Sequence, residues 1–206
     1  MTPQDIVFTP AIRQVQEAYG SRRQMARLEA HNRWGREIDG DLATFLAARN
    51  SFYLATASAE GRPYIQHRGG LPGFLKVLDG RTLGFADYPG NRQYITAGNL
   101  SENGQAFIFL MDYANRRRVK LWGRAEVVTD DATLIARLHD PRMPARPERA
   151  IRFHLEAWDL NCPQFIPAKY DEPEVAAALQ KLQDRIAELE AELAAAKAAA
   201  APGGTG

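Results

Sequence analysis

Residues 52–68 read FYLATASAEGRPYIQHR, and this stretch has the pattern of a β-hairpin. Residues 52–57 are rich in aromatic and apolar side chains, as is typical of a strand. Glu60, Gly61 and Pro63 then mark a tight turn that leads into a second strand over 64–68. The stretch therefore predicts the start of an antiparallel sheet.

Further strand-like runs follow at hairpin spacing. They cover residues 73–78, 82–86, 106–111, 119–128 and 151–158. The Asp79-Gly80 dipeptide between the first two of these runs is a hairpin signal, and short helices are expected at 92–97 and 131–138. About six strands with this spacing predict a mostly antiparallel barrel or sandwich within the α+β class.

The segment before residue 50 has the pattern of three helices. Ile12, Val15 and Tyr19 fall on one face of the first helix. Ser21 is expected to cap the second helix and Asp39 the third. We expect these helices to cover one end of the sheet.

Apolar residues recur at alternating spacings of four and three near the C-terminus. They are Val175, Leu179, Leu182, Ile186, Leu189 and Leu193. This heptad seam predicts a coiled-coil helix. With Leu179 at an a position, Arg185 and Glu190 occupy g and e, the offset of an ion pair between parallel chains. The alternative is an amphipathic helix that packs on its own domain.

Composition and charge narrow the class of protein. We expect a first domain over 1–170, a heptad helix over 171–201 and a flexible tail over 202–206. The formal net charge of +1 shows no basic excess of the kind that nucleic-acid binding produces. Cys162 is the only cysteine, which excludes an intramolecular disulfide. With no long apolar run and no visible secretory signal, we expect a cytoplasmic protein that binds neither membrane nor nucleic acid.

The segment 87–93, Asp-Tyr-Pro-Gly-Asn-Arg-Gln, is the most informative candidate site. It follows a strand, contains a Pro-Gly turn and leads into an expected helix whose first residues are Asn91, Arg92 and Gln93. Backbone N–H groups at a helix start, together with a guanidinium, suit a phosphate monoester. The alternative is an ordinary polar cap.

The basic run at 116–120 is a second candidate. In a strand, Arg116, Arg118 and Lys120 share one face. That face has three interpretations: a basic surface beside a phosphate site, an RNA-binding surface or a solvated hairpin corner. The four histidines are scattered without the spacing of metal ligands, so no metal site is expected.

The order and spacing of these segments resemble the FMN-binding split-barrel family typified by pyridoxamine 5′-phosphate oxidase. The resemblance runs from about residue 41 to 128, with a looser tail to 170. It covers the hairpin that opens at 52, and TLGFADYPGNRQ at 82–93 is similar to the family's strand and Ser-Arg-Lys phosphate element. NLSEN at 99–103 and RRVKLWGRA at 117–125 resemble two further family stretches.

This resemblance implies a split β-barrel that binds FMN as a homodimer, with the flavin sites at the subunit interface. Arg92 would anchor the phosphate, and Gln164 would reach the flavin from a partner chain. The implied FMN contacts are Gln66, His67, Arg68, Ala86, Asp87, Asn91, Arg92, Gln93, Arg118, Asn161 and Gln164.

The C-terminal part departs from the oxidase itself. The Arg-Pro-x-x-Trp block and the Arg-Leu element that grip pyridoxal phosphate are missing, so vitamin B6 oxidation is not expected. We expect an FMN-dependent oxidoreductase that acts on an unidentified small molecule. The alternative is a non-catalytic flavin or haem binding or sensor protein. No acid–base residue is assigned, and His67 and Tyr88 are the candidates.

Overall fold

The computed structural model describes residues 2–31, 34–160 and 163–200. The chain divides into two compact units, Met1–Ile166 and Pro167–Gly206. The sheet and the helices α1–α6 belong to the first unit, and α7 (Glu172–Ala200) belongs to the second. Asn161 and the expected tail at 202–206 lie outside the described residues.

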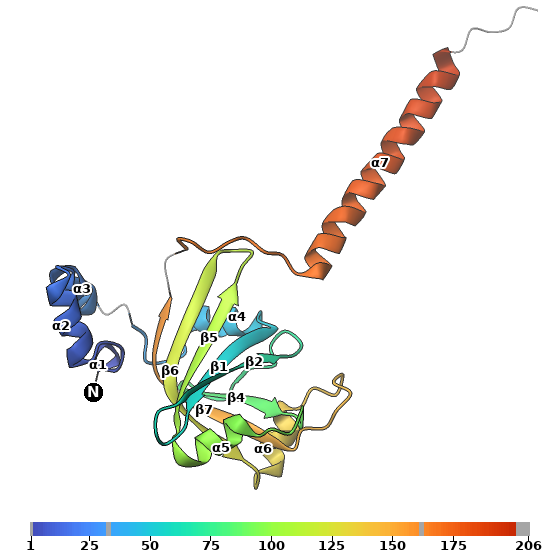
Figure 1. Ribbon diagram of the computed structural model, residues 1–206. Helices are drawn as coiled ribbons and strands as arrows, with labels where there is room; N and C mark the ends of the chain where they lie inside the picture. The colour runs from blue at the N-terminus through green and yellow to red at the C-terminus, as the bar shows by residue number, and fades with distance from the viewer. Residues whose placement is uncertain (1, 32–33, 161–162, 201–206) are drawn as a thin grey trace, which may run out of the picture. The chain divides into compact units, whose positions relative to one another are not determined.

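Within the described residues of the first unit, seven strands form one antiparallel sheet (Figure 1). They are β1 (Ser51–Ala57), β2 (Pro63–Gly69), β3 (Lys76–Val77), β4 (Thr82–Asp87), β5 (Gln105–Asp112), β6 (Arg117–Val128) and β7 (Arg149–Leu160). Their order is β2-β1-β5-β6-β7-β4-β3, so the sheet curves without closing. The prediction of a mostly antiparallel split β-barrel in the α+β class is confirmed.

The core follows from the two-residue period of the strands. In β5, Ile108 and Leu110 are fully buried inside the barrel, while Phe107 and Phe109 on the other face are only partly covered. Strand β4 is buried on both faces because α6 (Ala132–Leu138) packs on its outer side. A small second cluster of apolar residues lies there, made of Val128, Leu134, Leu138 and Ala150.

The remaining helices of the first unit are α1 (Pro3–Val7), α2 (Pro10–Ala18), α3 (Arg22–Ala30), α4 (Gly40–Ala47) and α5 (Ile95–Glu102). Asp39 caps α4 as predicted, since its carboxylate accepts the N–H of Leu42 at 2.8 Å. The prediction that Ser21 caps the second helix is wrong. Its backbone is already helical, and its hydroxyl donates to the carbonyl of Gln16 instead.

Two expected elements differ in extent. The helix expected at 92–97 begins only at Ile95, because Arg92 and Tyr94 have φ values of +58° and +53°, which no α-helix accommodates. The strand expected at 73–78 is reduced to β3. Gly73 has a φ of +79°, and its N–H bonds to the carbonyl of Arg49 rather than to a neighbouring strand.

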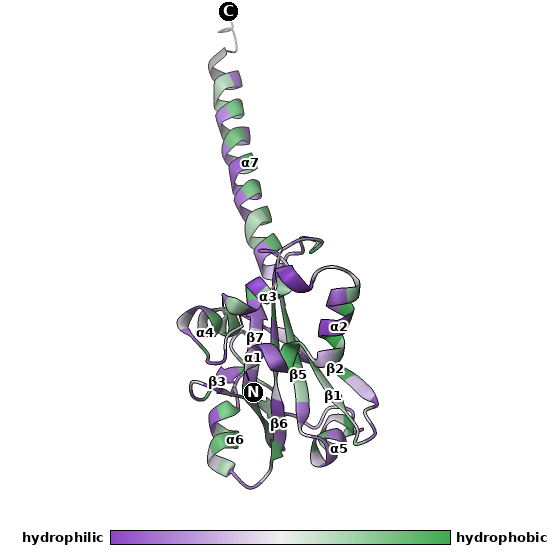
Figure 2. Ribbon diagram, turned by 90° about the vertical axis from the view of Figure 1, so that its left-hand side faces the viewer, coloured by the Kyte–Doolittle hydropathy of each residue, from purple (hydrophilic) through white to green (hydrophobic). Residues whose placement is uncertain are grey.

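Helix α7 carries the predicted heptad seam along one unbroken helix. Apolar and polar residues alternate around it (Figure 2). Within the second unit, its six seam residues are 44–61% exposed. None of the helices in the described ranges has both the length and the hydropathy needed to span a bilayer.

Gly123 offers a test of the packing between β6 and β7. A Cβ placed there would lie 2.1 Å from the carbonyl oxygen of His154, next to a register shift in β6. We expect Gly123→Ala to lower the free energy of unfolding by about 2 kcal/mol or more. The control is Gly98→Ala in α5, where a Cβ meets nothing within 4 Å. It should be neutral or raise stability by about 0.5 kcal/mol. Urea unfolding measures both, and similar losses would contradict this packing.

Candidate functional site

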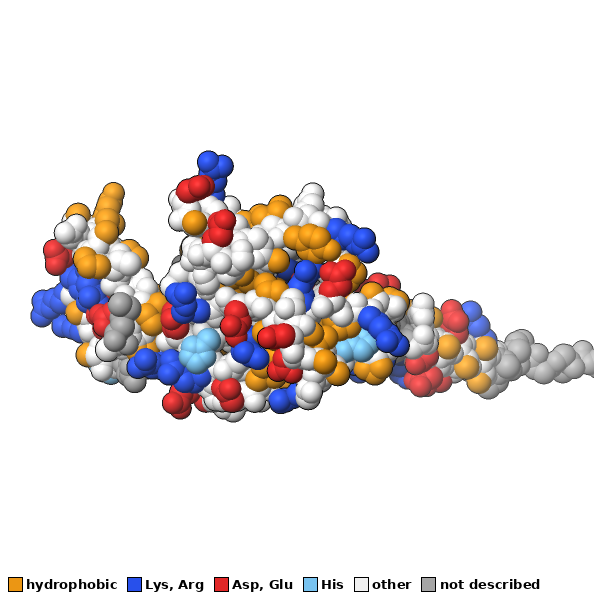
Figure 3. Space-filling view, turned by 90° about the horizontal axis from the view of Figure 1, so that it is seen from below, with side chains coloured by type: hydrophobic (Ala, Val, Ile, Leu, Met, Phe, Trp, Pro, Cys, Tyr) orange, Lys and Arg blue, Asp and Glu red, His pale blue; other side chains and the backbone are white. Residues whose placement is uncertain are grey.

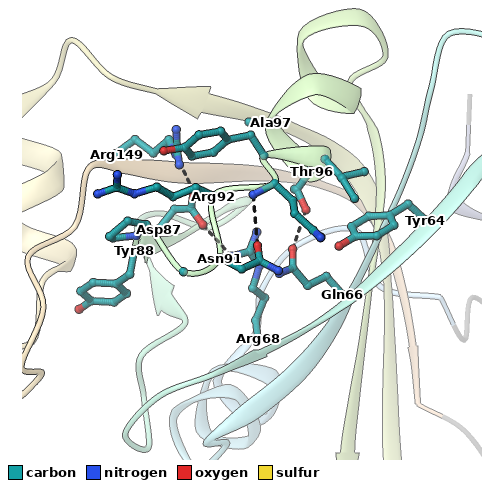
Figure 4. Close-up of a pocket in the computed structure, with 15 residues that line it drawn as sticks. Tyr64, Gln66, Arg68, Asp87, Tyr88, Asn91, Arg92, Thr96, Ala97 and Arg149 are labelled. Atoms are coloured by element: carbon teal, nitrogen blue, oxygen red, sulfur yellow. Dashed lines mark hydrogen bonds and ion pairs between the residues drawn. The ribbon is translucent and has the colours of Figure 1, made fainter.

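A cavity of about 230 Å³ lies between β2, the segment that follows β4, and the first residue of β7 (Figure 4). Strand β2 supplies Tyr64, Gln66 and Arg68, which share one face because the side chains of a strand alternate. Asp87 ends β4, and Arg149 begins β7. The cavity therefore draws on strands that are distant in the order of the sheet.

The carboxylate of Asp87 is held between two guanidinium groups. Nη1 of Arg68 lies 2.6 Å from one carboxylate oxygen, and Nε of Arg149 lies 2.6 Å from the other. The three side chains are only 8–16% exposed, so water screens these ion pairs weakly. Glu148 also pairs with Arg149 at 3.2 Å, so two cations and two anions balance in this network.

The surroundings of Arg149 favour its charged form. Burial disfavours the cation, but the hydrogen bond and charge of Asp87, the charge of Glu148 and the hydrogen bond with Tyr94 together outweigh burial, so the pKa of Arg149 is raised above its usual value. Its guanidinium also stacks 4.6 Å from the ring centre of Tyr94. Arg149 is thus a fixed cation at the wall of the cavity.

The segment between β4 and α5 forms the other wall. The N–H of Arg92 bonds to the carbonyl of Pro89 at 3.1 Å, and the N–H of Gln93 bonds to the side-chain oxygen of Asn91 at 3.2 Å. This turn aims the first residues of α5, including Thr96, at the cavity. The first N–H groups of a helix have no partner within it and carry partial positive charge, so they favour an anion.

Three side-chain hydrogen bonds fix α5 in place. The hydroxyl of Thr96 donates to Oε1 of Gln66 at 3.0 Å, which links the helix to β2. Nδ2 of Asn99 donates to the hydroxyl of Thr56 on β1 at 3.0 Å, and Nδ2 of Asn103 donates to the carbonyl of Ser58 at 3.3 Å. The NLSEN stretch therefore positions the start of the helix at the cavity.

The structure brings part of the predicted site together. The predicted contacts that line the cavity are Gln66, Arg68, Asp87, Asn91, Arg92 and Gln93. The last three are exposed, and the side chain of Arg92 extends away from Gln66 (Figure 4). The anchored cations of the cavity are therefore Arg68 and Arg149, with Arg92 at the rim.

Other predicted contacts lie elsewhere in this chain. His67 is on the opposite face of β2, in edge-to-face contact with Tyr53 at 5.7 Å. Ala86 packs against the α6 cluster, Arg118 lies on β6, and Gln164 is exposed after β7. Flavin contact by these residues stays a prediction, as does that of Asn161 outside the described residues.

Arg149, Thr96 and Tyr94 line the cavity but were missed in the sequence. Arg149 pairs with Asp87 because β7 lies next to β4, and Asp87 is its direct partner in the register. Asp87 and Arg149 are 62 residues apart in the sequence. No local pattern in the sequence indicates it.

The basic run at 116–120 does not form one strand face as predicted. Arg116 lies in the turn before β6 with a φ of +51°, so the alternation begins at Arg117. Arg117 stacks over Phe45, and Lys120 pairs with Asp159 at 3.6 Å. On the face seen in Figure 3, Lys and Arg side chains lie among Asp and Glu side chains. Across the described residues, no group of three His, Cys, Asp or Glu side chains is placed to hold a metal.

Comparisons with known proteins agree with this fold. The family model described as pyridoxamine 5′-phosphate oxidase matches residues 38–162. No curated protein matches the sequence. A variant of HupZ from Group A Streptococcus is 21% identical with a TM-score of 0.50, over 60% of this chain and 99% of that one. That match supports the split-barrel fold.

Two further solved structures are similar at lower scores. An FMN-binding protein from Syntrophomonas wolfei subsp. wolfei is 12% identical with a TM-score of 0.48, over 68% of this chain and 94% of its own. The general stress protein 26 from Bacillus anthracis str. Sterne is 16% identical with a TM-score of 0.43, over 57% and 89%.

Removing the carboxylate of Asp87 tests the ion network. Asp87→Ala leaves two mostly buried guanidinium groups without their shared anion, so we expect a loss of about 3–5 kcal/mol in the free energy of unfolding. The control is Glu126→Ala, whose ion pair with Arg152 is exposed at 2.7 Å and should contribute less than about 1 kcal/mol. Equal losses in urea unfolding would show that the network does not hold the barrel together.

Proposed function

The chain belongs to the pyridoxamine 5′-phosphate oxidase family, and from this premise we propose that it binds FMN and acts as an FMN-dependent oxidoreductase on a small molecule. The observation that carries the proposal is the pair of mostly buried arginine side chains, Arg68 and Arg149, at the cavity beside the start of α5. Guanidinium groups and helix N–H groups together are the donors that phosphate monoesters prefer.

The cavity residues fit the phosphate end of FMN. Asp87 holds Nη1 of Arg68 and Nε of Arg149 at 2.6 Å each, which fixes both guanidinium groups at the wall of the cavity. Arg68, Arg92 and Arg149 carry three positive charges, against the negative charges of Asp87 and of Glu148, which pairs with Arg149 at 3.2 Å. The remaining positive charge favours an anion such as a phosphate. When bound, the flavin supplies the redox chemistry, and these residues anchor and orient it.

The size of the cavity favours a site shared by two chains. Pockets that enclose a ligand of this size usually span about 300–1,000 Å³, whereas this one is about 230 Å³. It accommodates the phosphate end and leaves the ring system outside. We propose that a second copy covers the ring, with Gln164 of the partner subunit contributing, as the family resemblance implies.

The outer face of β1 and β2 supports this homodimer. Tyr53 is 40% exposed and Ile65 is 62% exposed there, beside the partly covered Phe107 and Phe109 of β5. A contiguous apolar face of this kind typically marks a protein interface. It is the face of the sheet opposite to Leu54 and Ile108 of the core.

One observation favours a second candidate function, a flavin-binding protein without turnover. Among the described residues that line the cavity, Asp87 is the only carboxylate, and both of its oxygens are already paired with arginines. No histidine is among those lining residues. The two functions differ in one measurement. An oxidoreductase accelerates the reduction of bound FMN by a suitable donor. In a carrier or sensor, bound FMN is reduced at the same rate as free FMN.

FMN binding is tested by titrating the protein with FMN and by recording the flavin absorbance at ~450 nm. We expect Arg92→Ala to weaken FMN binding about tenfold, because it removes a charge-assisted hydrogen bond at the rim of the cavity. Arg116→Ala removes an equally basic side chain from the turn before β6 and should leave the affinity unchanged. A colourless protein with no affinity for added FMN would overturn the proposal, and equal losses would overturn the phosphate assignment.

The homodimer is tested by sedimentation and by one pair of variants. We expect a mass of two chains at micromolar concentration, and a mass of one chain would contradict it. Ile65→Asp places a charge in the proposed interface and should weaken FMN binding tenfold or more. Val77→Asp makes the same kind of change at the opposite edge of the sheet, where Val77 is 36% exposed, and should not affect FMN binding.

A further inference from the structure

The heptad helix carries an interaction surface that the flavin site does not use. All six seam residues of α7 are about half exposed in the described helix. A single helix in water gains most of its stability from packing its apolar face against a partner. We propose that α7 pairs with α7 of a second copy of this chain as a parallel, two-stranded coiled coil. This proposal rests on α7 alone and is independent of FMN binding.

The charges beside the seam specify the partner. With Leu179 at an a position, Arg185 is at g and Glu190 at e of the next heptad. In a parallel pair, a g residue faces the e residue five positions later on the partner. Arg185 then faces Glu190 of the partner subunit. One heptad later, Glu192 at g faces Lys197 of the partner subunit at e.

These contacts are absent within one helix. Arg185 reaches Glu188 at 2.8 Å and Glu192 at 3.8 Å along its own helix. Glu190 is five positions from Arg185, whereas helix neighbours are three or four positions apart. Both g–e pairings have opposite charges, so two identical helices complement each other in the parallel arrangement.

The orientation also determines where the chains enter the coil. The 29 residues of α7 span about 43 Å at 1.5 Å per residue. In a parallel pair, both copies of Glu172 lie at the same end, and in an antiparallel pair they lie at opposite ends. Each seam position lies against its own copy only in the parallel pair, where Leu182 lies against Leu182 of the partner subunit.

Disulfide cross-linking of the full chain reads out this register directly. In a Cys162→Ser background, Leu182→Cys places a thiol at a d position of the seam. Asp184→Cys places one at the outward f position two residues away. In a glutathione redox buffer, we expect covalent two-chain species at least tenfold more abundant for Leu182→Cys than for Asp184→Cys. Equal yields would overturn the proposal. They would result if the helices paired in antiparallel fashion, if α7 packed against its own chain, or if chains met only by random collision.

Charge reversal tests the pairing partner. Arg185→Glu and Glu190→Lys each create repulsive g–e pairs with a second copy of the same variant, but all such pairs are attractive between the two variants. Both chains carry Cys162→Ser and Leu182→Cys, and one carries a mass tag. After mixing and equilibration, we expect mixed dimers to exceed the two pure dimers together about threefold. Intrahelical effects are the same in pure and mixed pairs. A statistical 1:2:1 distribution, or a non-covalent mass of three chains, would overturn the proposal.

Discussion

The ion network of Asp87 joins parts of the barrel that backbone hydrogen bonds leave apart. In the order of the sheet, β2 is one edge, and β4 lies next to the other edge strand. Among the described strands, β2 pairs with β1 alone. The 2.6 Å contact from Arg68 on β2 to Asp87 on β4 spans that opening, and Arg149 holds the carboxylate from β7. Ion pairs, rather than backbone hydrogen bonds, thus connect β2 to β4 across the open side of the barrel.

The same three side chains line the candidate site. Buried ion pairs recover the cost of desolvation only when their geometry is good and their remaining donors are satisfied. Here the shared carboxylate of Asp87 holds both guanidinium groups at 2.6 Å, and all three side chains line the cavity. Arg68, Asp87 and Arg149 therefore bridge the opening of the barrel and also line the candidate site.

Local patterns in the sequence predicted what local physics determines. The strand expected at 106–111, the Asp39 cap and the seam of α7 follow from residues a few positions apart. The late start of α5 could not be predicted in this way, because it depends on the positive φ values of Arg92 and Tyr94. These are uncommon for residues with a Cβ. Arg149 was missed for another reason, since its role depends on the register of β7 against β4.

The structure brings some of the predicted site residues together but differs from the expectation in which cations are held in place. The resemblance places Arg92 at the phosphate, and Arg92 does line the cavity. However, its side chain is exposed, so holding it in one conformation costs side-chain entropy that Arg68 and Arg149 have already lost on folding. A bound phosphate would therefore gain most from the two buried cations and from the start of α5. Arg92 adds charge at the rim, where water screens it more strongly.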